Sequence, residues 1–346
     1  MSFVRMRVDQ AALAKNYRLF TEQAIGEVGA VVKANGYGLG SIPIAKSLQA
    51  EGCQAFFVAT LPEALELRPH VNGTIYVFEP PLDEEGLALT SATGCIPVVN
   101  SQAQLARAQE MPNIRIALHV DTGMERLGIP YQAINAEALQ AANVTLLLTH
   151  LACADRPDDP FNVTQIERFA TITAQFPDIR TSIGNSAGTL NGPQFQGDLA
   201  RPGIGLYGAN PFTTLENPTA TVVTCEAQVL DIRAVAAGSG IGYGRTYIAP
   251  ETARIAIVGF GYADGLPRVL SNIGKFAFGE TLLPIRGYIS MDMTQIEVTN
   301  CPELKVGDWV EFFGKTIDCD EVAKTANSFG YEFLTGLGKR VERLYV

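Results

Sequence analysis

Lys33 ends a run of valines in the stretch VVKANGYGLG, residues 31–40, and is followed at once by Asn35, Tyr37 and three glycines. A lysine that closes a buried strand costs free energy unless its amine has a use, because burying an unpaired charge is unfavourable. Two interpretations are open from this stretch alone. Either the lysine caps the end of a strand, or its amine anchors a carbonyl cofactor covalently.

Polar side chains also follow several later apolar runs. They are His119, Asp121 and Arg126; His150 and Asp155; Asn185 and Ser186; and Arg201, Gly203 and Ile204. The small residues of GNSAGTL, 184–190, suit a turn that begins a helix, and backbone N–H groups there and at Gly203 and Ile204 suit a phosphate. A lysine opposite such a site, flanked by arginines, favours pyridoxal 5'-phosphate in Schiff-base linkage. A phosphosugar enzyme would need the same two features and stays an alternative.

The elements that must position these residues are short apolar runs separated by amphipathic segments. We count eight runs, at 28–33, 55–60, 74–78, 95–99, 114–120, 144–150, 179–184 and 199–208. Segments such as QAQLARA and QIERFATI between them repeat apolar residues at helical spacing. Strands buried on both faces and joined by helices indicate a parallel sheet, and eight such units predict an α/β fold, the (β/α)8 TIM barrel. A doubly wound open sheet is the alternative, although no GxGxxG follows an early strand.

After about residue 215 the pattern changes to short alternating strands with glycine turns, as in ATVVTCEAQVLDIRAV, 220–235. We therefore predict a barrel domain over 1–214, which binds the cofactor, and a mainly-β C-terminal domain over 215–346. The segment VDQAALAKNYRLF, 8–20, is expected to form an amphipathic helix that packs on the barrel.

Composition excludes several classes of function. A formal net charge of −10 disfavours a nucleic-acid partner, because phosphate backbones need a basic surface. No apolar run approaches the roughly 20 residues of a membrane span, and the N-terminus lacks the pattern of a signal peptide. The six cysteines have no CxxC spacing and the three histidines are dispersed, so we expect free thiols, no metal site and a cytoplasmic location.

Motifs along nearly the whole chain resemble those of the alanine racemase family. In order they are VVKANGYGLG, HVDTGMERLGI, THLACAD, GNSAGTL, RPGIGLYGANP, GYGRTY, GYADGLPR and GYISMDMTQIEV. The resemblance implies a fold-type III pyridoxal-phosphate enzyme with an N-terminal barrel and a C-terminal β domain. Lys33 would hold the cofactor and act as the base toward the D-antipode. Tyr243, supplied by the β domain of a partner subunit, would be the base toward the L-antipode.

The resemblance also implies which residues hold the cofactor and the substrate. Arg201 would bond the pyridine nitrogen, Arg126 the phenolic oxygen, and His150 would stack on the ring or support Tyr243. The remaining cofactor-binding residues would be Tyr37, Asn185, Ser186, Gly203 and Ile204, around the phosphate. Met291 and Asp292 would shape the substrate side together with Arg126, and Tyr262 would form an entry gate.

Three positions depart from the family pattern. The family usually has a lysine at the position of His119, often as a carbamate that orients the following arginine, and commonly a histidine at the position of Leu39. A tyrosine that many members carry near the C-terminus has no clear equivalent in TGLGKRVERLYV. His119 cannot form a stable carbamate, so Arg126 must be held in another way.

We expect a homodimeric racemase that interconverts L-alanine and D-alanine and supplies D-alanine for cell-wall peptidoglycan. A serine or broad-specificity amino acid racemase, a related decarboxylase and a non-catalytic pyridoxal-phosphate carrier are the alternatives. Relatives of the carrier type are bare barrels, so the β domain with Tyr243 disfavours that alternative.

Overall fold

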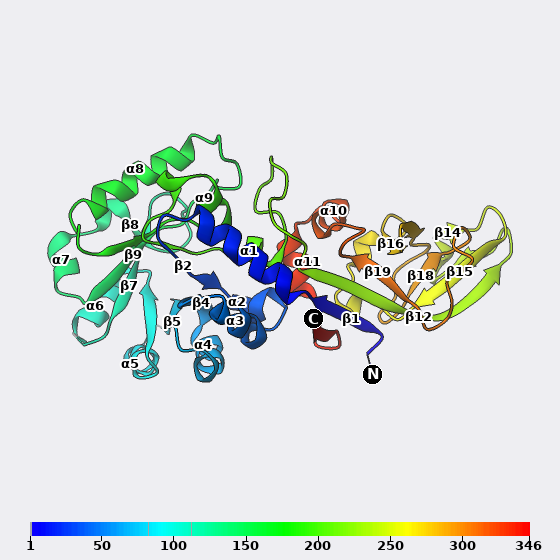
Figure 1. Ribbon diagram of the computed structural model, residues 1–346, viewed down its shortest axis with the longest axis horizontal. Helices are drawn as coiled ribbons and strands as arrows, with labels where there is room; N and C mark the ends of the chain where they lie inside the picture. Colours follow the sequence, from blue (N-terminus) through cyan, green and yellow to red (C-terminus); the bar gives the residue numbers. More distant parts are fainter. Residues whose placement is uncertain (1, 82, 112) are drawn as a thin grey trace. The chain divides into compact units, whose positions relative to one another are not determined.

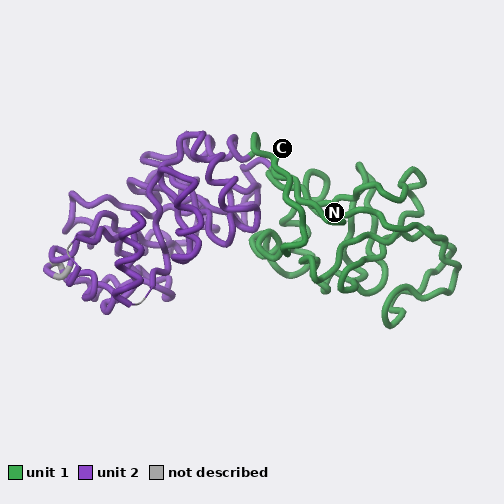
Figure 2. The backbone as a smooth tube through the Cα atoms, turned by 90° about the horizontal axis from the view of Figure 1, so that it is seen from below, with its two compact units in different colours: residues 1–12, 221–346 green, residues 13–220 purple. Residues whose placement is uncertain are grey.

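The computed structural model describes residues 2–81, 83–111 and 113–346. The chain forms two compact units, residues 13–220 and residues 1–12 with 221–346, which are described separately (Figure 2). The first twelve residues therefore belong to the same unit as the C-terminal part, unlike in the predicted division at residue 215. That division stays a prediction.

Residues 13–220 form a barrel of parallel strands, as the apolar runs predicted (Figure 1). Among the described residues the eight strand positions are β2 (Glu27–Val28) with β3 (Ala30–Val31), β4 (Ala55–Thr60), β5 (Thr74–Glu79), β6 (Cys95–Val99), β7 (Ile116–Asp121), β9 (Val144–Leu148), β10 (Arg180–Ser182) and β11 (Leu199–Ala200). From β3 to β10 each strand pairs in parallel with the next, and β11 pairs with β2. Every position coincides with a predicted run.

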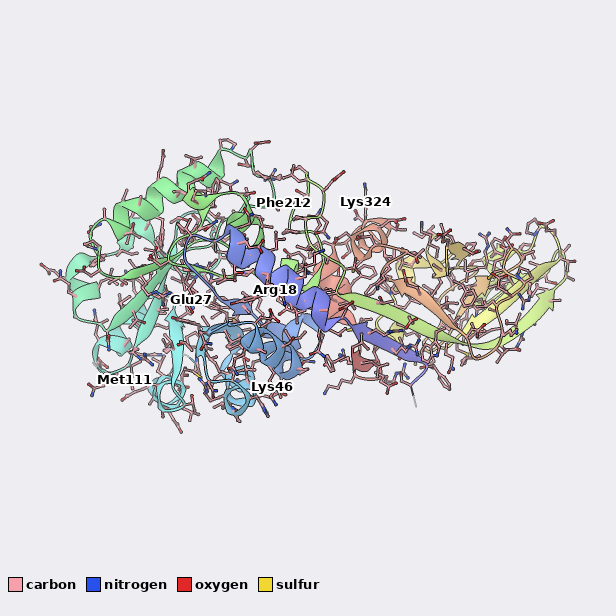
Figure 3. The ribbon with its side chains drawn as sticks, in the orientation of Figure 1. Arg18, Glu27, Lys46, Met111, Phe212 and Lys324 are labelled. Atoms are coloured by element: carbon pink, nitrogen blue, oxygen red, sulfur yellow. The ribbon has the colours of Figure 1, made fainter. Side chains whose placement is uncertain are left out.

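Backbone and side-chain contacts join β10, β11 and the first strand, and so close the barrel. The Arg201 N–H donates to the Gly184 carbonyl at 2.7 Å, and the Gly29 N–H donates to the Ala200 carbonyl at 2.9 Å. At the amino ends of the strands, Arg180 Nη2 lies 2.7 Å from Glu27 Oε2; Glu27 is labelled in Figure 3. Because the ring is closed, the carboxyl ends of all these strands share one rim, which we call the barrel mouth.

Helices and short turns connect the strands. They are α1 (Gln10–Gln23), α2 (Lys33–Tyr37), α3 (Ser41–Ala50), α4 (Leu61–Leu67), η1 (Arg68–His70), α5 (Glu84–Ala92), α6 (Gln102–Gln109), η2 (Tyr131–Ala133), α7 (Ala136–Gln140), α8 (Phe161–Thr173), α9 (Ser186–Leu190), η3 (Pro193–Phe195) and η4 (Ile204–Tyr207), with the short strand β8 (Ile129–Pro130) beside β7. Local sequence explains several starts, because the side chains of Asp83 and Ser101 accept N-terminal N–H groups of α5 and α6.

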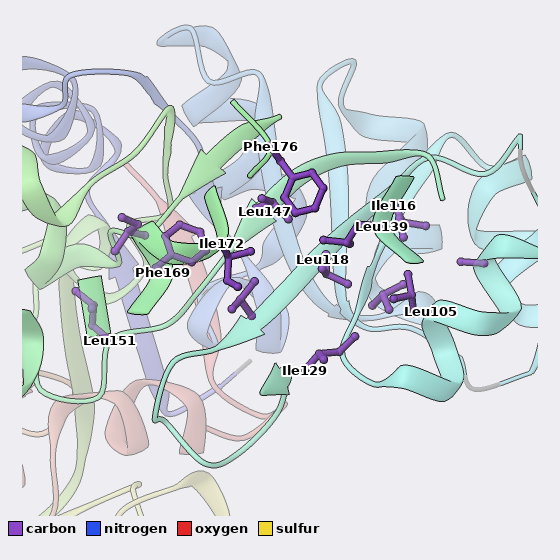
Figure 4. Packing of buried hydrophobic residues seen from close by; sticks show 14 of the residues in the cluster. Leu105, Ile116, Leu118, Ile129, Leu139, Leu147, Leu151, Phe169, Ile172 and Phe176 are labelled. Carbon is purple, nitrogen blue, oxygen red and sulfur yellow. The ribbon is translucent and has the colours of Figure 1, made fainter. Parts of the chain in front are cut away.

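A cluster of buried apolar residues fills the layer between strands and helices (Figure 4). Ile116, Leu118 and Val120, on one side of β7, pack in it with Phe169 and Ile172 of α8. Since side chains alternate along a strand, the intervening residues of β7, among them His119, face the barrel interior. The alternation thus places a histidine of β7 inside the barrel.

Helix α1 packs on the barrel, as expected for the 8–20 segment. Leu13, Tyr17 and Phe20 are buried, and the Tyr17 hydroxyl donates to the Val28 carbonyl of β2 at 2.8 Å. Asn16 Nδ2 donates to the Leu206 carbonyl of η4 at 3.2 Å. The helix therefore braces the first strand and the turn after the last one.

The other unit is mainly β, as predicted. Its strands are β1 (Val4–Val8), β12 (Val223–Val235), β13 (Gly240–Ile241), β14 (Tyr247–Ile248), β15 (Ala253–Val258), β16 (Lys275–Phe278), β17 (Thr281–Pro284), β18 (Thr294–Glu297), β19 (Trp309–Phe313) and β20 (Glu342–Tyr345). Its short helical segments are η5 (Tyr243–Arg245), η6 (Tyr262–Asp264), η7 (Arg268–Leu270), α10 (Cys319–Thr325) and α11 (Gly330–Gly336). The long strand β12 pairs with β1, β15 and β19.

Strand β1 explains why the first residues belong to this unit. It runs antiparallel to β12, with Val4 opposite Ala227, and parallel to β20, with Arg5 opposite Glu342. Val4, Met6 and Val8 are buried on one face of the strand. The local sequence does not predict this strand, because its partners lie more than two hundred residues away.

No helix in the described part of the chain is both long enough and apolar enough to pass through a membrane.

Candidate active site

Lys33 lies at the barrel mouth as the first residue of α2, separated from β3 by Val32. The backbone that follows is left-handed from Ala34 to Gly38, with φ values of 51°, 54°, 62°, 54° and 83°. Non-glycine residues rarely adopt this region, so the surrounding structure must hold the turn in place. Glu63 Oε1 accepts the Ala34 N–H at 2.8 Å, and Asn35 Oδ1 accepts the Ser41 N–H at 3.1 Å.

The Lys33 amine lies in an environment that favours its neutral form. Burial is the largest cause that lowers its pKa, and the positive charge of Arg126 lowers it further, against the opposing effect of Glu79 and Glu63. The nitrogen lies 5.7 Å from the centre of the Phe78 ring. A neutral amine is the nucleophilic form that attacks a carbonyl carbon.

Two backbone donors after strand β11 converge on a single oxygen atom. Ser186 Oγ accepts the N–H of Gly203 at 2.8 Å and the N–H of Gly205 at 3.2 Å. Ser186 begins α9, while the preceding Asn185 caps that helix by accepting the Gly188 N–H at 2.8 Å. Ile204 is buried as the first residue of η4. The structure thus brings together the residues predicted to surround a phosphate.

Tyr37 lies against the same turn. A Cβ atom on Gly203 would overlap the Tyr37 hydroxyl oxygen and lie 3.1 Å from its Cζ, so the close approach requires glycine. The rings of Tyr37 and Tyr207 lie 4.6 Å apart, and the Tyr207 hydroxyl donates to the Val31 carbonyl at 2.6 Å. These contacts join the loop after strand one to the loop after strand eight.

Arg201 is a buried cation, with 3% of its surface exposed. Its Nη1 donates to Ser182 Oγ, and its Nη2 donates to the carbonyls of Thr149 at 2.6 Å and Ile183 at 3.4 Å. No carboxylate of the described residues pairs with it, and burial lowers its pKa to about 10. The guanidinium therefore stays charged at neutral pH among neutral acceptors only.

His150 and Arg126 complete the predicted set on the barrel. Burial is the largest cause that holds the pKa of His150 well below its ordinary value, and the charges of Arg201 and Arg126 add to it. Arg126 is exposed and follows a loop in which Asp121 accepts the N–H groups of residues 123–125. In the described part of the chain its side chain has no hydrogen bond and no ion pair.

The four remaining predicted residues belong to the β unit. Tyr243 lies between Gly242 and Gly244 in η5 and is 71% exposed, while Tyr262 of η6 and Met291 are also exposed. Asp292 Oδ1 accepts from Arg340 Nη1 at 2.9 Å, and Arg340 Nε lies 2.8 Å from Asp264 Oδ1. Lys33 and Tyr243 therefore come from different units of the chain.

Comparison with known proteins decides the family. The family model described as "Alanine racemase, N-terminal domain" matches residues 8–211, and "Alanine racemase, C-terminal domain" matches residues 222–345. The chain belongs to the alanine racemase family.

Individual relatives support this assignment. An alanine racemase of Acidiphilium cryptum is 42% identical over 99% of both chains, and one of Rhizobium meliloti is 38% identical over 99% of this chain and 96% of its own. Among solved structures, the alanine racemase of Bartonella henselae with covalently bound pyridoxal phosphate covers both chains completely, with a TM-score of 0.94 and 35% identity. The biosynthetic alanine racemase of Pseudomonas aeruginosa covers both chains completely as well, with a TM-score of 0.93 and 33% identity.

The residues at the barrel mouth fit the cofactor of this alanine racemase family. An amine driven toward its neutral form suits a covalent bond to an aldehyde, and converging N–H donors with a hydroxyl suit a phosphate. Arg201 offers a buried positive donor that does not lose its proton at neutral pH.

Several supporting residues were not predicted from the sequence. Ser182 and Thr149 accept from Arg201, Glu63 holds the turn after Lys33, and Asn100 bonds His119. Each is a common polar residue in or next to an apolar run. Only its position just beyond a barrel strand or at the first turn of a helix could have drawn attention to it.

Proposed function

We propose that the chain interconverts L-alanine and D-alanine with pyridoxal 5'-phosphate, using Lys33 and Tyr243 as two bases. The observation that carries the proposal is the Lys33 amine. It is half-buried at the barrel mouth, where burial and then the charge of Arg126 lower its pKa and favour the neutral form. The strand-eight loop of the same barrel presents converging N–H donors. Membership of the alanine racemase family supports the reaction and the cofactor.

Residues of the barrel would hold the cofactor. Lys33 would bind it covalently, Arg201 would donate to the pyridine nitrogen, and Arg126 to the phenolic oxygen, with His150 beside the ring. Around the phosphate would lie Tyr37, Asn185, Ser186, Gly203 and Ile204. When bound, the cofactor withdraws electrons from Cα of the amino acid and makes its hydrogen acidic.

The two bases would serve opposite faces of the substrate. Lys33 Nζ would exchange a proton with one face of Cα, and Tyr243 Oη with the other, because a single base reaches both faces poorly. Arg126 has a second effect here, since its charge adds to burial in lowering the pKa of the Lys33 amine and so favours the form that accepts a proton. His150, neutral through burial, would accept or donate a hydrogen bond without adding a charge.

The substrate side and the assembly belong to the same proposal. Met291, Asp292 and Tyr262 would shape the substrate entrance together with Arg126, and Tyr243 would act in the site of a partner subunit. The exposure of Tyr243, Tyr262 and Met291 supports a homodimer in which a second copy covers them. We also propose a cytoplasmic enzyme that supplies D-alanine for the cell wall, and the six free cysteines agree with a reducing compartment.

The test is to purify the protein with pyridoxal phosphate and to look for a yellow chromophore that borohydride bleaches. Uptake of deuterium from solvent at Cα is then followed from each alanine enantiomer, with serine as the competing substrate. We expect exchange from both enantiomers of alanine. A protein that stays colourless would contradict the proposal, a coloured protein without exchange would be a carrier, and faster exchange of serine would indicate the broader racemase.

A Lys33→Ala variant provides the matched control. It should lose the bleachable chromophore and at least about a thousandfold in racemisation, since both covalent binding and one base are removed. Racemisation that persists in this variant would contradict the roles proposed for Lys33 as cofactor anchor and base.

A further inference from the structure

His119 has a hydrogen-bonding atom with no partner. The residue is 7% exposed on β7, and its Nδ1 lies 2.8 Å from Asn100 Oδ1. Its Nε2 is buried and has no hydrogen-bond partner among the residues that the structure describes. A buried unsatisfied polar atom costs free energy, so it calls for a physical reason.

The hydrogen bonds of Asn100 fix the tautomer of this ring. Asn100 Nδ2 donates to the carbonyls of Phe78 at 2.7 Å and Val98 at 2.8 Å. Carbonyl oxygens only accept, so the amide nitrogen must face them and Oδ1 must face His119. An amide oxygen also only accepts, so His119 Nδ1 carries the proton. In the neutral ring, Nε2 then presents a lone pair and accepts a hydrogen bond.

His119 stays neutral around pH 7. Burial is the largest cause that lowers its pKa to about 4, and the charges of Arg201 and Arg126 add to it, against the opposing effect of Asp121. Two arginines therefore lie near a ring whose Nε2 needs a donor. Arg201 already donates to Ser182, Thr149 and Ile183.

Arg126 is the remaining candidate donor, and the loop that carries it packs on His119. A Cβ atom on Gly128 would lie 3.2 Å from His119 Cδ2, so the end of the loop touches the ring. Gly123 and Gly128 have φ values of 127° and 114°, which gives the loop a glycine near each end. Within the described ranges the Arg126 guanidinium has no hydrogen bond and no ion pair, so its N–H donors are available.

We propose that His119 is a positioning residue, whose Nε2 accepts a hydrogen bond from the Arg126 guanidinium and so directs that side chain over the barrel mouth. The inference rests on the proposed function, which assigns Arg126 to the cofactor and the substrate. A neutral acceptor orients the guanidinium without cancelling its charge, and that charge adds to burial in lowering the pKa of the Lys33 amine. Asn100 orients the ring in turn.

The first experiment observes the ring itself in the cofactor-loaded enzyme. The chain has three histidines, so 15N labelling of histidine yields a spectrum simple enough to assign. We expect His119 as the Nδ1–H tautomer. In Arg126→Lys we expect its Nε2 resonance to move toward that of a free pyridine-type nitrogen. Arg18→Lys is the control, since Arg18 pairs with Glu51 on the surface. An Nε2–H tautomer, or an Nε2 resonance that Arg126→Lys leaves in place, would overturn the inference.

The second experiment separates positioning from a general structural role. His119→Asn keeps a donor for Asn100 but has no atom at the Nε2 position, whereas His119→Gln reaches that position with an amide oxygen. We expect His119→Asn to lower kcat/KM about tenfold and to shift the cofactor absorption band, and His119→Gln to stay within about threefold of the parent. Arg126→Lys should then cost much less in the His119→Asn background than in the parent.

Additive effects of the two changes in a yellow, active enzyme would overturn this inference and leave the proposed function intact. A colourless, inactive parent enzyme would instead overturn the proposed function.

Discussion

Lys33, His119 and His150 are three bases that share one electrostatic environment. His119 is buried, and Lys33 and His150 are half-buried. Burial is the largest cause that lowers the pKa of all three, the charge of Arg126 adds to it at each, and the charge of Arg201 adds to it at the two histidines. Among the described residues, the Arg201 guanidinium donates to a hydroxyl and to carbonyl oxygens only. Because no carboxylate among the described residues neutralises it, its field adds to burial in lowering the pKa of the two histidines.

Because His119 is neutral in the folded protein, we predict how the free energy of unfolding depends on pH. Its pKa is 6.5 in the unfolded chain and about 4 in the folded one, so between these values only the unfolded chain binds the proton. The free energy of unfolding should therefore fall as the pH drops from about 6.5 to 4. The difference corresponds to about 3 kcal/mol, at about 1.4 kcal/mol per pKa unit.

Urea denaturation between pH 7 and 4.5 measures this slope. His119→Gln should flatten it, although His150 adds a contribution in the same direction. His70→Gln, which removes the histidine at the end of η1, is the control. An identical slope in His119→Gln and in the parent protein would show that His119 does not titrate in this way.

Among the elements, the turn after β11 depends on the absence of a side chain at Gly203. We predict that Gly203→Ala destabilises the protein by about 1–3 kcal/mol and weakens pyridoxal phosphate binding, because the new methyl group overlaps Tyr37. Thermal unfolding and cofactor titration measure the two effects. Gly336→Ala is the control, since a Cβ atom there meets nothing within 4 Å.

Adding Tyr37→Phe to Gly203→Ala removes the overlapping oxygen and should recover part of the lost stability. If the double variant is as unstable as the sum of the two single variants, the overlap with Tyr37 is not the cause.

Much of the element order was predictable because it depends on local pattern. The eight apolar runs became the barrel strands, since strands buried on both faces are continuous in sequence. Helix α5 was not predicted. Strand β1 could not be assigned to the C-terminal sheet, because the residues of a strand do not indicate a partner strand that lies more than two hundred residues away.

The site was predictable only in part, for the same reason. Lys33 stood out as a charge at the end of a buried strand, and Arg201 as a charge inside an apolar run. The turn after Lys33 includes Ala34 and Asn35, whose residue types do not by themselves predict a left-handed backbone conformation. The bond between Asn100 and His119 joins two strands and follows from the closed barrel rather than from either motif.

For the whole molecule, the central question is which chain supplies each base. Lys33 belongs to the barrel unit and Tyr243 to the β unit, where it is 71% exposed. In the proposed homodimer, each site takes Lys33 from one copy and Tyr243 from the other. A symmetric dimer then has two equivalent sites, and each copy contributes to both.

This assembly predicts complementation between two inactive variants. Lys33→Ala and Tyr243→Phe are co-expressed with different affinity tags, and the hybrid carrying both tags is isolated. In shared sites, one site of the hybrid has both defects and the other has neither, so the hybrid should have about half the activity of the parent dimer. Dimers of either single variant, purified in the same way, should be nearly inactive. If both bases of a site came from one chain, every site of the hybrid would have one defect, so an inactive hybrid that still carries both tags would contradict the shared site.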